Sequence, residues 1–170
     1  MDDLPIHERY GATRPRPWFR RSVQAMLKSV PRQYLIGLES VVLSESSFLT
    51  SKQLRVEGRS VPENRCLSFY HLATRDRKAW IELIVDNIGA EYPSWLRRLP
   101  LLRDLPVSSA LFHEIGHHIE ATSVRGTRAG ESRAEKWETT LARPYFGQRY
   151  RFIAPLIRLI TSVWQELRGR

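Results

Sequence analysis

Apolar residues along the chain recur at the spacing of an α-helix in several long stretches. Residues 18–30 form one of them, and Pro31 should end that helix because the residue before a proline avoids helical backbone angles. A second helix is predicted from Asp104 or Ser108, either of which can cap a helix, to about residue 121. Further helices are predicted over residues 131–142 and 150–167.

Shorter apolar runs have the character of β-strands. Residues 79–88 give the clearest pattern, because successive side chains alternate between two faces of a strand. One face would carry Trp80, Glu82, Ile84 and Asp86, and the other Ile81, Leu83 and Val85. Strands are also predicted over residues 34–43 and 67–72, and the polar stretch between them should be a loop. These elements together predict an α+β fold.

Length and composition indicate one domain. The chain has 170 residues, and its hydrophobic fraction of 42% is enough for an ordinary core. Residues 1–17 are rich in proline and glycine and should form a flexible arm before a domain over residues 18–170. The single cysteine excludes an internal disulfide framework. No apolar leader and no run of about 18 apolar residues is present, so we expect a cytoplasmic protein without a transmembrane segment.

The charge of the chain favours anionic partners. It has 27 Lys+Arg against 18 Asp+Glu, a net charge of +9, which suits nucleic acid, an acidic protein or anionic lipid. The arginines are scattered in pairs, such as Arg20-Arg21 and Arg97-Arg98, without a zinc-finger, P-loop or RNA-recognition signature. A solvated basic surface is therefore favoured over a dedicated nucleic-acid site.

The stretch over residues 107–120, VSSALFHEIGHHIE, contains an HExxH motif. His113 and His117 are four residues apart, so on a helix both imidazoles lie on one face and can bind one zinc ion. Glu114 lies beside the first histidine, where a general base for a metal-activated water is needed. The alternative is a pair of core histidines on an apolar helix, and the adjacent glutamate favours the metal site.

A second helical stretch, ESRAEKWETTLARP over residues 131–144, follows the motif. It resembles the second half of the gluzincin zinc-peptidase pattern, in which a glutamate begins an E-x-x-A-[NDE]-x-[aromatic] helix. Compact ImmA/IrrE-like peptidases pair HExGH with such a helix, which often ends in a leucine and a proline, as Leu141 and Pro144 do here. The resemblance covers residues 111–144.

This resemblance implies a single zincin-like domain. A small, mostly antiparallel sheet would pack on the HExxH helix, with a second ligand-bearing helix and a C-terminal amphipathic helix. The zinc ligands would be His113, His117 and Glu131, and Glu114 would act as general base on a zinc-bound water. Zn²⁺ would be the cofactor and a peptide or protein the substrate. No oligomeric state is implied.

Other polar side chains near the motif have expected supporting roles. Glu135 stands where the family commonly has Asp or Asn, a group that orients a ligating histidine. It is also the direct rival to Glu131 as third ligand, and Glu120 is a further rival; we favour Glu131. His118 points about 100° away from His117 on a helical wheel and should support the ligands or lie on the surface. At the position of Glu138 the gluzincin pattern usually has a small residue.

The resemblance also implies that the substrate lies extended along an edge strand. That strand would be residues 80–88, although an ordinary buried strand fits the same pattern equally well. A donor to the oxyanion is also expected. Candidates by residue type alone are His71, Tyr145 and Tyr150.

Three functions follow from these patterns. The leading one is a zinc metallopeptidase. The second is a catalytically weak or inactive zincin scaffold that uses its basic surface to bind nucleic acid or an acidic protein. The third is an interaction protein whose helix at residues 150–167 docks on a partner or a membrane, although that helix is most simply packed on the domain.

Overall fold

The computed structural model describes residues 3–11, 17–56, 59–60, 62–91, 93, 95, 98–123 and 131–152. Its strands are β1 (Ile6–Arg9), β2 (Leu38–Ser44), β3 (Arg55–Val56), β4 (Arg59–Ser60), β5 (Ser68–His71) and β6 (Ala79–Ile84). The main sheet has the order β1-β2-β6-β5, and β3 pairs with β4 in a separate hairpin. β1 is parallel to β2 and β2 is parallel to β6, whereas β5 is antiparallel to β6. The fold is α+β, as predicted, with a mixed sheet.

The prediction of a mostly antiparallel sheet is wrong, because β2 is parallel both to β6 and to β1. β1 comes from the segment expected to be a flexible arm. β1 reads IHER and is mostly exposed, so its sequence has no apolar alternation that would predict a strand. It pairs with β2 through the backbone, with Ile6 opposite Val41. Helix α1 (Pro17–Ser29) connects the two strands, and a parallel pair needs a crossover connection of this kind.

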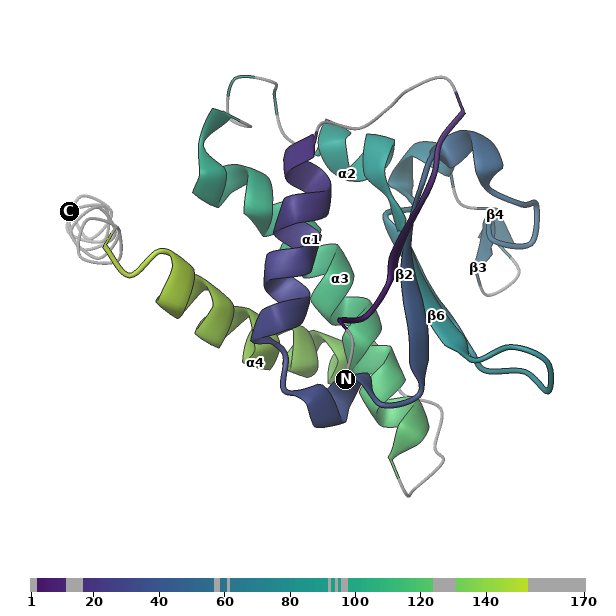
Figure 1. The fold of residues 1–170 in the computed structure, drawn as a ribbon. Coiled ribbons are helices and arrows are strands. Elements are labelled where there is room, and N and C mark those ends of the chain that lie inside the picture. Colours follow the sequence, from purple (N-terminus) through teal and green to yellow (C-terminus); the bar gives the residue numbers. More distant parts are fainter. Residues whose placement is uncertain are drawn as a thin grey trace, which may run out of the picture.

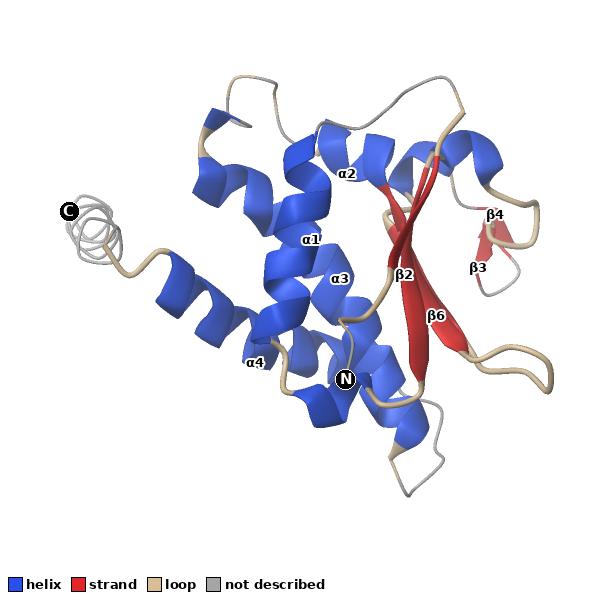
Figure 2. Cartoon of the chain, in the orientation of Figure 1, coloured by secondary structure: helices blue, strands red, loops and turns tan. Residues whose placement is uncertain are grey.

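Helices gather on one side of the sheet. α1, α3 (Pro100–Thr122) and α4 (Glu131–Arg149) lie together there, and the β3–β4 hairpin lies on the other side (Figure 1; Figure 2). The shorter elements are α2 (Val85–Ala90) and the 3-10 turns η1 (Arg32–Leu35), η2 (Ser46–Phe48) and η3 (Glu63–Arg65). Within the described part of the chain, no helix combines the length and the apolarity needed to cross a membrane.

α3 is the central helix and carries much of the core. Its Leu111, Phe112 and Ile115 are fully buried and join Ile81 and Leu83 of β6 in one hydrophobic cluster. α1 contributes its apolar face to the same cluster, and this confirms the helix predicted over residues 18–30. The buried apolar side chains of α1 are Phe19, Val23, Met26 and Leu27.

Both long helices extend beyond their predicted bounds and contain a proline. α3 begins at Pro100 and includes Pro106. α4 passes through Pro144, which the sequence predicts to follow its end, and continues to Arg149. A proline inside a helix removes a backbone hydrogen bond, so such helices need support from tertiary contacts.

The buried carboxylate of Asp104 in α3 supplies part of that support. It accepts hydrogen bonds from the hydroxyl groups of Ser22 in α1 (2.6 Å), Tyr145 in α4 (2.6 Å) and Tyr150 just beyond α4 (2.7 Å). We call these four residues the Asp104 hub. The hub joins the last turns of α4 to α1 and α3, a long-range contact that local sequence patterns do not reveal.

β6 is an interior strand, so the edge-strand role predicted for residues 80–88 is wrong. It lies between β2 and β5, and it ends at Ile84, where α2 begins. The alternative, an ordinary buried strand, is confirmed by the burial of most of its side chains. The strand predicted over residues 67–72 is present as β5, and β5 forms the edge of the sheet that contacts α3.

Two other predicted elements differ in extent. The strand predicted over residues 34–43 begins only at Leu38, because η1 takes the preceding residues. Of the helix predicted over residues 150–167, the first residues form a turn after α4, and residues 153–167 lie outside the described residues.

Candidate metal centre

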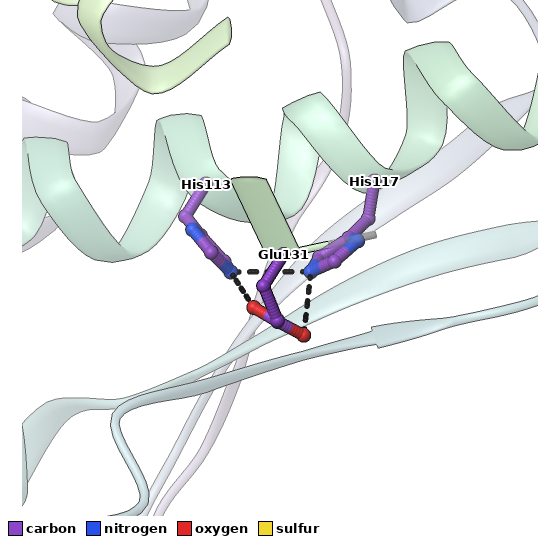
Figure 3. Close-up of side chains that lie close together, drawn as sticks. All are labelled: His113, His117 and Glu131. Atoms are coloured by element: carbon purple, nitrogen blue, oxygen red, sulfur yellow. Dashed lines mark hydrogen bonds and ion pairs between the residues drawn. The ribbon is translucent and has the colours of Figure 1, made fainter. Parts of the chain in front are cut away.

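Two histidines one turn apart on α3 point into the same space beside the sheet. The Nε2 atoms of His113 and His117 are 3.1 Å apart (Figure 3). Their side chains are 23% and 19% exposed, so the helix holds the rings while one edge of each stays accessible. Positions four residues apart share a helical face, which explains why the rings meet.

Glu131, the first residue of α4, completes a cluster with these histidines. Its Oε2 atom lies 3.2 Å from His113 Nε2, and its Oε1 atom lies 3.8 Å from His117 Nε2 (Figure 3). Among the described residues, these three form the one group of metal-ligating side chains whose ligand atoms converge. The cluster therefore joins two helices that are separate in sequence.

A small residue on α3 lets α4 approach the histidines. Gly116 packs so closely on α4 that an added β-carbon would lie 2.9 Å from the carbonyl oxygen of Ala134. Beside this contact, the Trp137 indole of α4 donates to Glu120 Oε1 of α3 at 2.9 Å, and Arg133 pairs with Glu120 at 3.2 Å. These contacts place Glu131 over the histidines and engage Glu120, the predicted rival ligand, elsewhere.

The cluster fits a zinc ion in spacing and in chemistry. Zinc bonds of about 2.0–2.2 Å in a tetrahedron place neighbouring ligand atoms about 3.4 Å apart. The three separations in the cluster are 3.1, 3.2 and 3.8 Å. Two imidazole nitrogens at the shortest of these distances need a proton or a cation between their lone pairs. Two histidines and one carboxylate are also a ligand set of catalytic zinc sites, in which a fourth position stays open.

Glu114 lies beside the cluster in a buried position. Its Oε1 atom accepts a hydrogen bond of 2.7 Å from the Ser68 hydroxyl of β5. Burial raises the pKa of the Glu114 carboxyl to about 7, while the Ser68 hydrogen bond and the nearby His113 oppose that rise. A carboxyl with a pKa near neutrality can both take and release a proton, as a general base and acid must.

Glu138, and not Glu135, lies behind His113. Glu138 Oε2 is 3.6 Å from His113 Nδ1, and this contact is the largest cause of the raised pKa of His113. Glu135 is exposed and lies outside the converging cluster. In this structure the contact behind His113 is made by Glu138, which lies two turns after Glu131 and faces α3, and the expected orienting role of Glu135 stays a prediction. The pKa of His117 is lowered, by burial first and by His113 second.

His118 is a buried link between α3 and its neighbours rather than a surface group. Its Nε2 atom lies 3.0 Å from the carbonyl oxygen of Ile36, and its Nδ1 atom lies 3.0 Å from the Tyr70 hydroxyl. A carbonyl only accepts, so Nε2 carries the proton and donates, and Nδ1 accepts from Tyr70. Burial lowers the pKa of His118, which keeps the ring neutral.

The structure separates the candidates for an oxyanion donor. Tyr145 and Tyr150 both donate to Asp104 in the hub, so their hydroxyls are committed there. His71 lies on β5, where its Nε2 atom is 3.0 Å from the buried Glu82 and its ring stacks on Trp80 at 3.7 Å. Of the three, His71 alone is on the edge strand that contacts α3, and strand alternation places it on the opposite face of that strand from Ser68 and Tyr70.

Sequence reasoning missed Ser68, Tyr70 and Glu138. Strand alternation in SFYH over residues 68–71 carries a signal, since the first and third residues must share a face. That face contacts α3 at Glu114 and His118. The signal for Glu138 is its seven-residue spacing from Glu131, two helical turns on one face.

Comparisons with known proteins add no assignment. No protein-family model matches the chain, and neither the curated proteins nor the solved structures contain a match. The resemblance to gluzincin peptidases thus rests on the motif residues, and any function must be argued from the geometry.

Proposed function

We propose that this chain is a zinc-dependent peptidase in which His113, His117 and Glu131 hold the metal. The observation that carries the proposal is the convergence of three ligand atoms from two helices beside a buried glutamate. When bound, zinc supplies Lewis-acid polarisation of a carbonyl group and activation of water at neutral pH. This combination of metal and carboxylate is suited to the hydrolysis of a peptide bond.

Glu114 would transfer the protons. Its carboxylate accepts the proton of the attacking water and later delivers it to the leaving amine. The Ser68 hydrogen bond at 2.7 Å fixes one carboxyl oxygen and leaves the other for the water. Burial favours the protonated form of the carboxyl, which helps it to accept a proton.

The edge strand β5 would position the substrate. Among the described residues, β5 has a strand partner on one side only, β6. An extended peptide can add to the free side through backbone hydrogen bonds, the mode called β-augmentation. Because Ser68 of β5 touches Glu114, a peptide on this side would pass directly over the proposed base.

The test combines metal content with turnover in three proteins. We expect the wild type and Glu114→Gln to hold about one zinc ion per chain, as measured by mass spectrometry of the metal, because Glu114 is not a ligand. A mixed peptide library, with products read by mass spectrometry, should be cleaved by the wild type, and Glu114→Gln should lower the rate by about 10²–10⁴-fold. Unchanged zinc content in a His113→Ala, His117→Ala double variant would overturn the metal site. Undiminished cleavage by Glu114→Gln would overturn the role of the base.

A further inference from the structure

A cavity of about 430 Å³ lies where the first described residues, the end of α1 and the start of β2 come together, in the lower part of Figure 1. Its volume is within the range of roughly 300–1,000 Å³ that is usual for ligand pockets. Its lining residues include none of the three metal-ligand candidates and not Glu114. A ligand in this cavity would therefore occupy a second site, separate from the proposed metal centre.

The walls of the cavity are mainly apolar. Leu27, Val30 and Leu38 belong to the hydrophobic core and line the cavity from that side. Ile36 lines it at the surface, where it is 67% exposed, an unfavourable position for a large aliphatic side chain. A bound apolar group would cover Ile36 and remove it from water. The other apolar lining residues are Leu4, Pro5 and Leu35.

The wall at Ile36 is held in place by the fold itself. Gly37 has a φ of 92°, a left-handed value that glycine adopts readily, and here the chain turns from η1 into β2. The carbonyl oxygen of Ile36 also accepts a hydrogen bond of 3.0 Å from the buried His118. The cavity is therefore preformed, and a ligand would not have to order this segment when it binds.

The two carboxylates that line the cavity are each engaged by a basic residue. Asp3 pairs with Lys28 at 3.3 Å, and Lys28 also lines the cavity. Glu39 pairs with Arg77, whose Nε atom lies 3.6 Å from it. Neither carboxylate is thus free to attract a cationic ligand.

Two further cations at the cavity have no such partner. Over the residues that the structure describes, no carboxylate lies within ion-pair distance of Arg32 or Lys78, and both side chains are exposed. Arg32 begins η1, which leads into β2, and Lys78 directly precedes Ala79, which pairs with Leu38 at the start of β2. A guanidinium group can bind a carboxylate through two parallel hydrogen bonds, and an ammonium group adds a second positive charge.

The end of α1 does not cancel this attraction. The C-terminal end of a helix carries partial negative charge on its last carbonyl groups. Here the Met26 carbonyl accepts from the Ser29 hydroxyl at 2.6 Å, and the Leu27 carbonyl accepts from the Val30 amide at 3.2 Å. The charge that remains to be neutralised at the cavity is therefore positive.

We propose that this cavity binds a single-chain amphiphile with an anionic head group, of the chemical class of medium-chain fatty carboxylates. The alkyl chain lies against the core side of the cavity and covers Ile36, while the carboxylate pairs with Arg32 and Lys78. A neutral head group forfeits the ion pairs, and a cationic one is repelled. A short anion forfeits the apolar contacts.

Four small compounds test the proposal by calorimetric titration of the full chain, below the concentrations at which they aggregate. Decanoate, decan-1-ol and decylammonium share one chain length and differ in head-group charge, and acetate has the anionic head without the chain. Decanoate should bind at least about tenfold more tightly than decan-1-ol, because it alone gains the charge-assisted bonds. Decylammonium should bind more weakly than decan-1-ol, and acetate should give no measurable binding.

Other orders of affinity would overturn the proposal. Equal affinities for decanoate and decan-1-ol would overturn the role of the cations, and acetate binding as tight as that of decanoate would overturn the role of the apolar walls. Failure of all three ten-carbon compounds to bind would overturn the site. Sedimentation of the chain with phosphatidylglycerol vesicles, without binding of monomeric decanoate, would assign this surface to a membrane instead.

Charge variants locate the head group. Arg32→Gln and Lys78→Gln should each weaken decanoate binding about tenfold and leave decan-1-ol binding unchanged. Lys136→Gln removes one positive charge at an exposed position of α4 that does not line the cavity, and it should bind decanoate as the wild type does. Equal losses in all three variants would show only a general attraction to the basic chain and would overturn the site.

A second matched pair locates the alkyl chain. Ile36→Ser should weaken binding of decanoate and of decan-1-ol alike, by about fivefold, because both lose the same apolar contact. Leu72→Ser makes a comparable change at a residue that is 63% exposed and does not line the cavity, and it should have no effect. Both positions are exposed, so both variants should fold. Unchanged affinity in Ile36→Ser would overturn the proposed position of the chain.

Discussion

Gly116 of α3 and Ala134 of α4 are in closer contact than any side chain at the first position would allow. A β-carbon at Gly116 would lie 2.9 Å from the Ala134 carbonyl oxygen and 3.0 Å from the Ala134 Cα atom. Both neighbours are backbone atoms, which cannot move aside as a flexible side chain can. Because Gly116 lies between the two ligand histidines and α4 begins with Glu131, this contact sets the distance between the ligands of the proposed site.

Gly116→Ala should therefore weaken zinc binding. The added methyl group pushes the start of α4 away from α3 and displaces Glu131 from the histidines. We expect at least about a tenfold loss of zinc affinity, the scale seen when groups that orient metal ligands are changed. Competition with a chromogenic zinc chelator measures this loss, and an unchanged affinity would show that the helix contact does not position Glu131.

Gly147→Ala is the matched control for that variant. Gly147 also lies in a helix, α4, but an added β-carbon there meets nothing within 4 Å. Alanine in an open helical position stabilises a protein by roughly 0.5–1 kcal/mol relative to glycine. We expect Gly147→Ala to raise the free energy of unfolding slightly and to leave the zinc affinity unchanged.

The third ligand is tested by three glutamine variants on α4. Glu131→Gln should lower zinc affinity most, because a neutral amide replaces a charged ligand oxygen. Glu138→Gln should lower it about 10–100-fold by weakening the contact behind His113, and Glu135→Gln should have no effect because Glu135 is exposed. Chelator competition on all three gives the order. A larger loss in Glu135→Gln than in Glu131→Gln would assign the ligand to the rival residue.

Much of the fold follows from the sequence, and the exceptions have physical causes. α1 and the HExxH helix were predicted correctly because each has an apolar face that is buried in the fold. β1 has no such pattern, and only its backbone pairing with β2 makes it a strand. The parallel pairing of β1 with β2 could not be predicted without β1. Likewise, α4 runs past Pro144 because Tyr145 and Tyr150 bond to a residue about 40 positions earlier, Asp104.

The residues of the candidate site also fall into those that the sequence predicts and those that only the packing reveals. His113, Glu114 and His117 are read directly from the spacing of residues on one helix, since four residues bring two side chains together on any α-helix. Glu131 was predicted as the third ligand only from the resemblance to gluzincin peptidases. Ser68 and Glu138 required the packing of β5 and α4 on α3, which depends on contacts more than 20 residues apart in sequence.

The buried His118 predicts a pH dependence of stability. Burial lowers its pKa below the ordinary 6.5, so the unfolded chain takes up a proton at a higher pH than the folded chain does. The stabilisation by the neutral ring is fully present above that ordinary value and declines as the pH falls below it, at up to about 1.4 kcal/mol per pH unit. In the zinc-free wild type this contribution of His118 should therefore be lost between about pH 7.5 and about pH 5.5, whereas the raised pKa values of Glu114 and His113 act on stability in the opposite direction.

His118→Phe isolates the contribution of that one ring from other titrating groups. The variant leaves the Ile36 carbonyl and the Tyr70 hydroxyl without their partner, so it is destabilised at about pH 7.5 by roughly 1–3 kcal/mol. The difference from wild type should narrow as the pH falls, because the wild type alone loses the neutral ring. Urea unfolding at both pH values measures this, and a constant difference would contradict it.

The Asp104 hub should support stability and not metal binding. Asp104 is fully buried and accepts hydrogen bonds from Ser22, Tyr145 and Tyr150. Asp104→Ala leaves these hydroxyls without an acceptor. The substitution should therefore lower the free energy of unfolding by about 3–5 kcal/mol. Tyr150→Phe removes one of these bonds and should cost about 1–3 kcal/mol. Urea unfolding gives both values.

In each variant that folds, zinc affinity should equal that of the wild type, because Gly116 and the Trp137–Glu120 bond hold the ligand end of α4 independently of its last turns. A loss of zinc affinity in Tyr150→Phe would instead show that α4 moves as one rigid unit and that the hub positions Glu131.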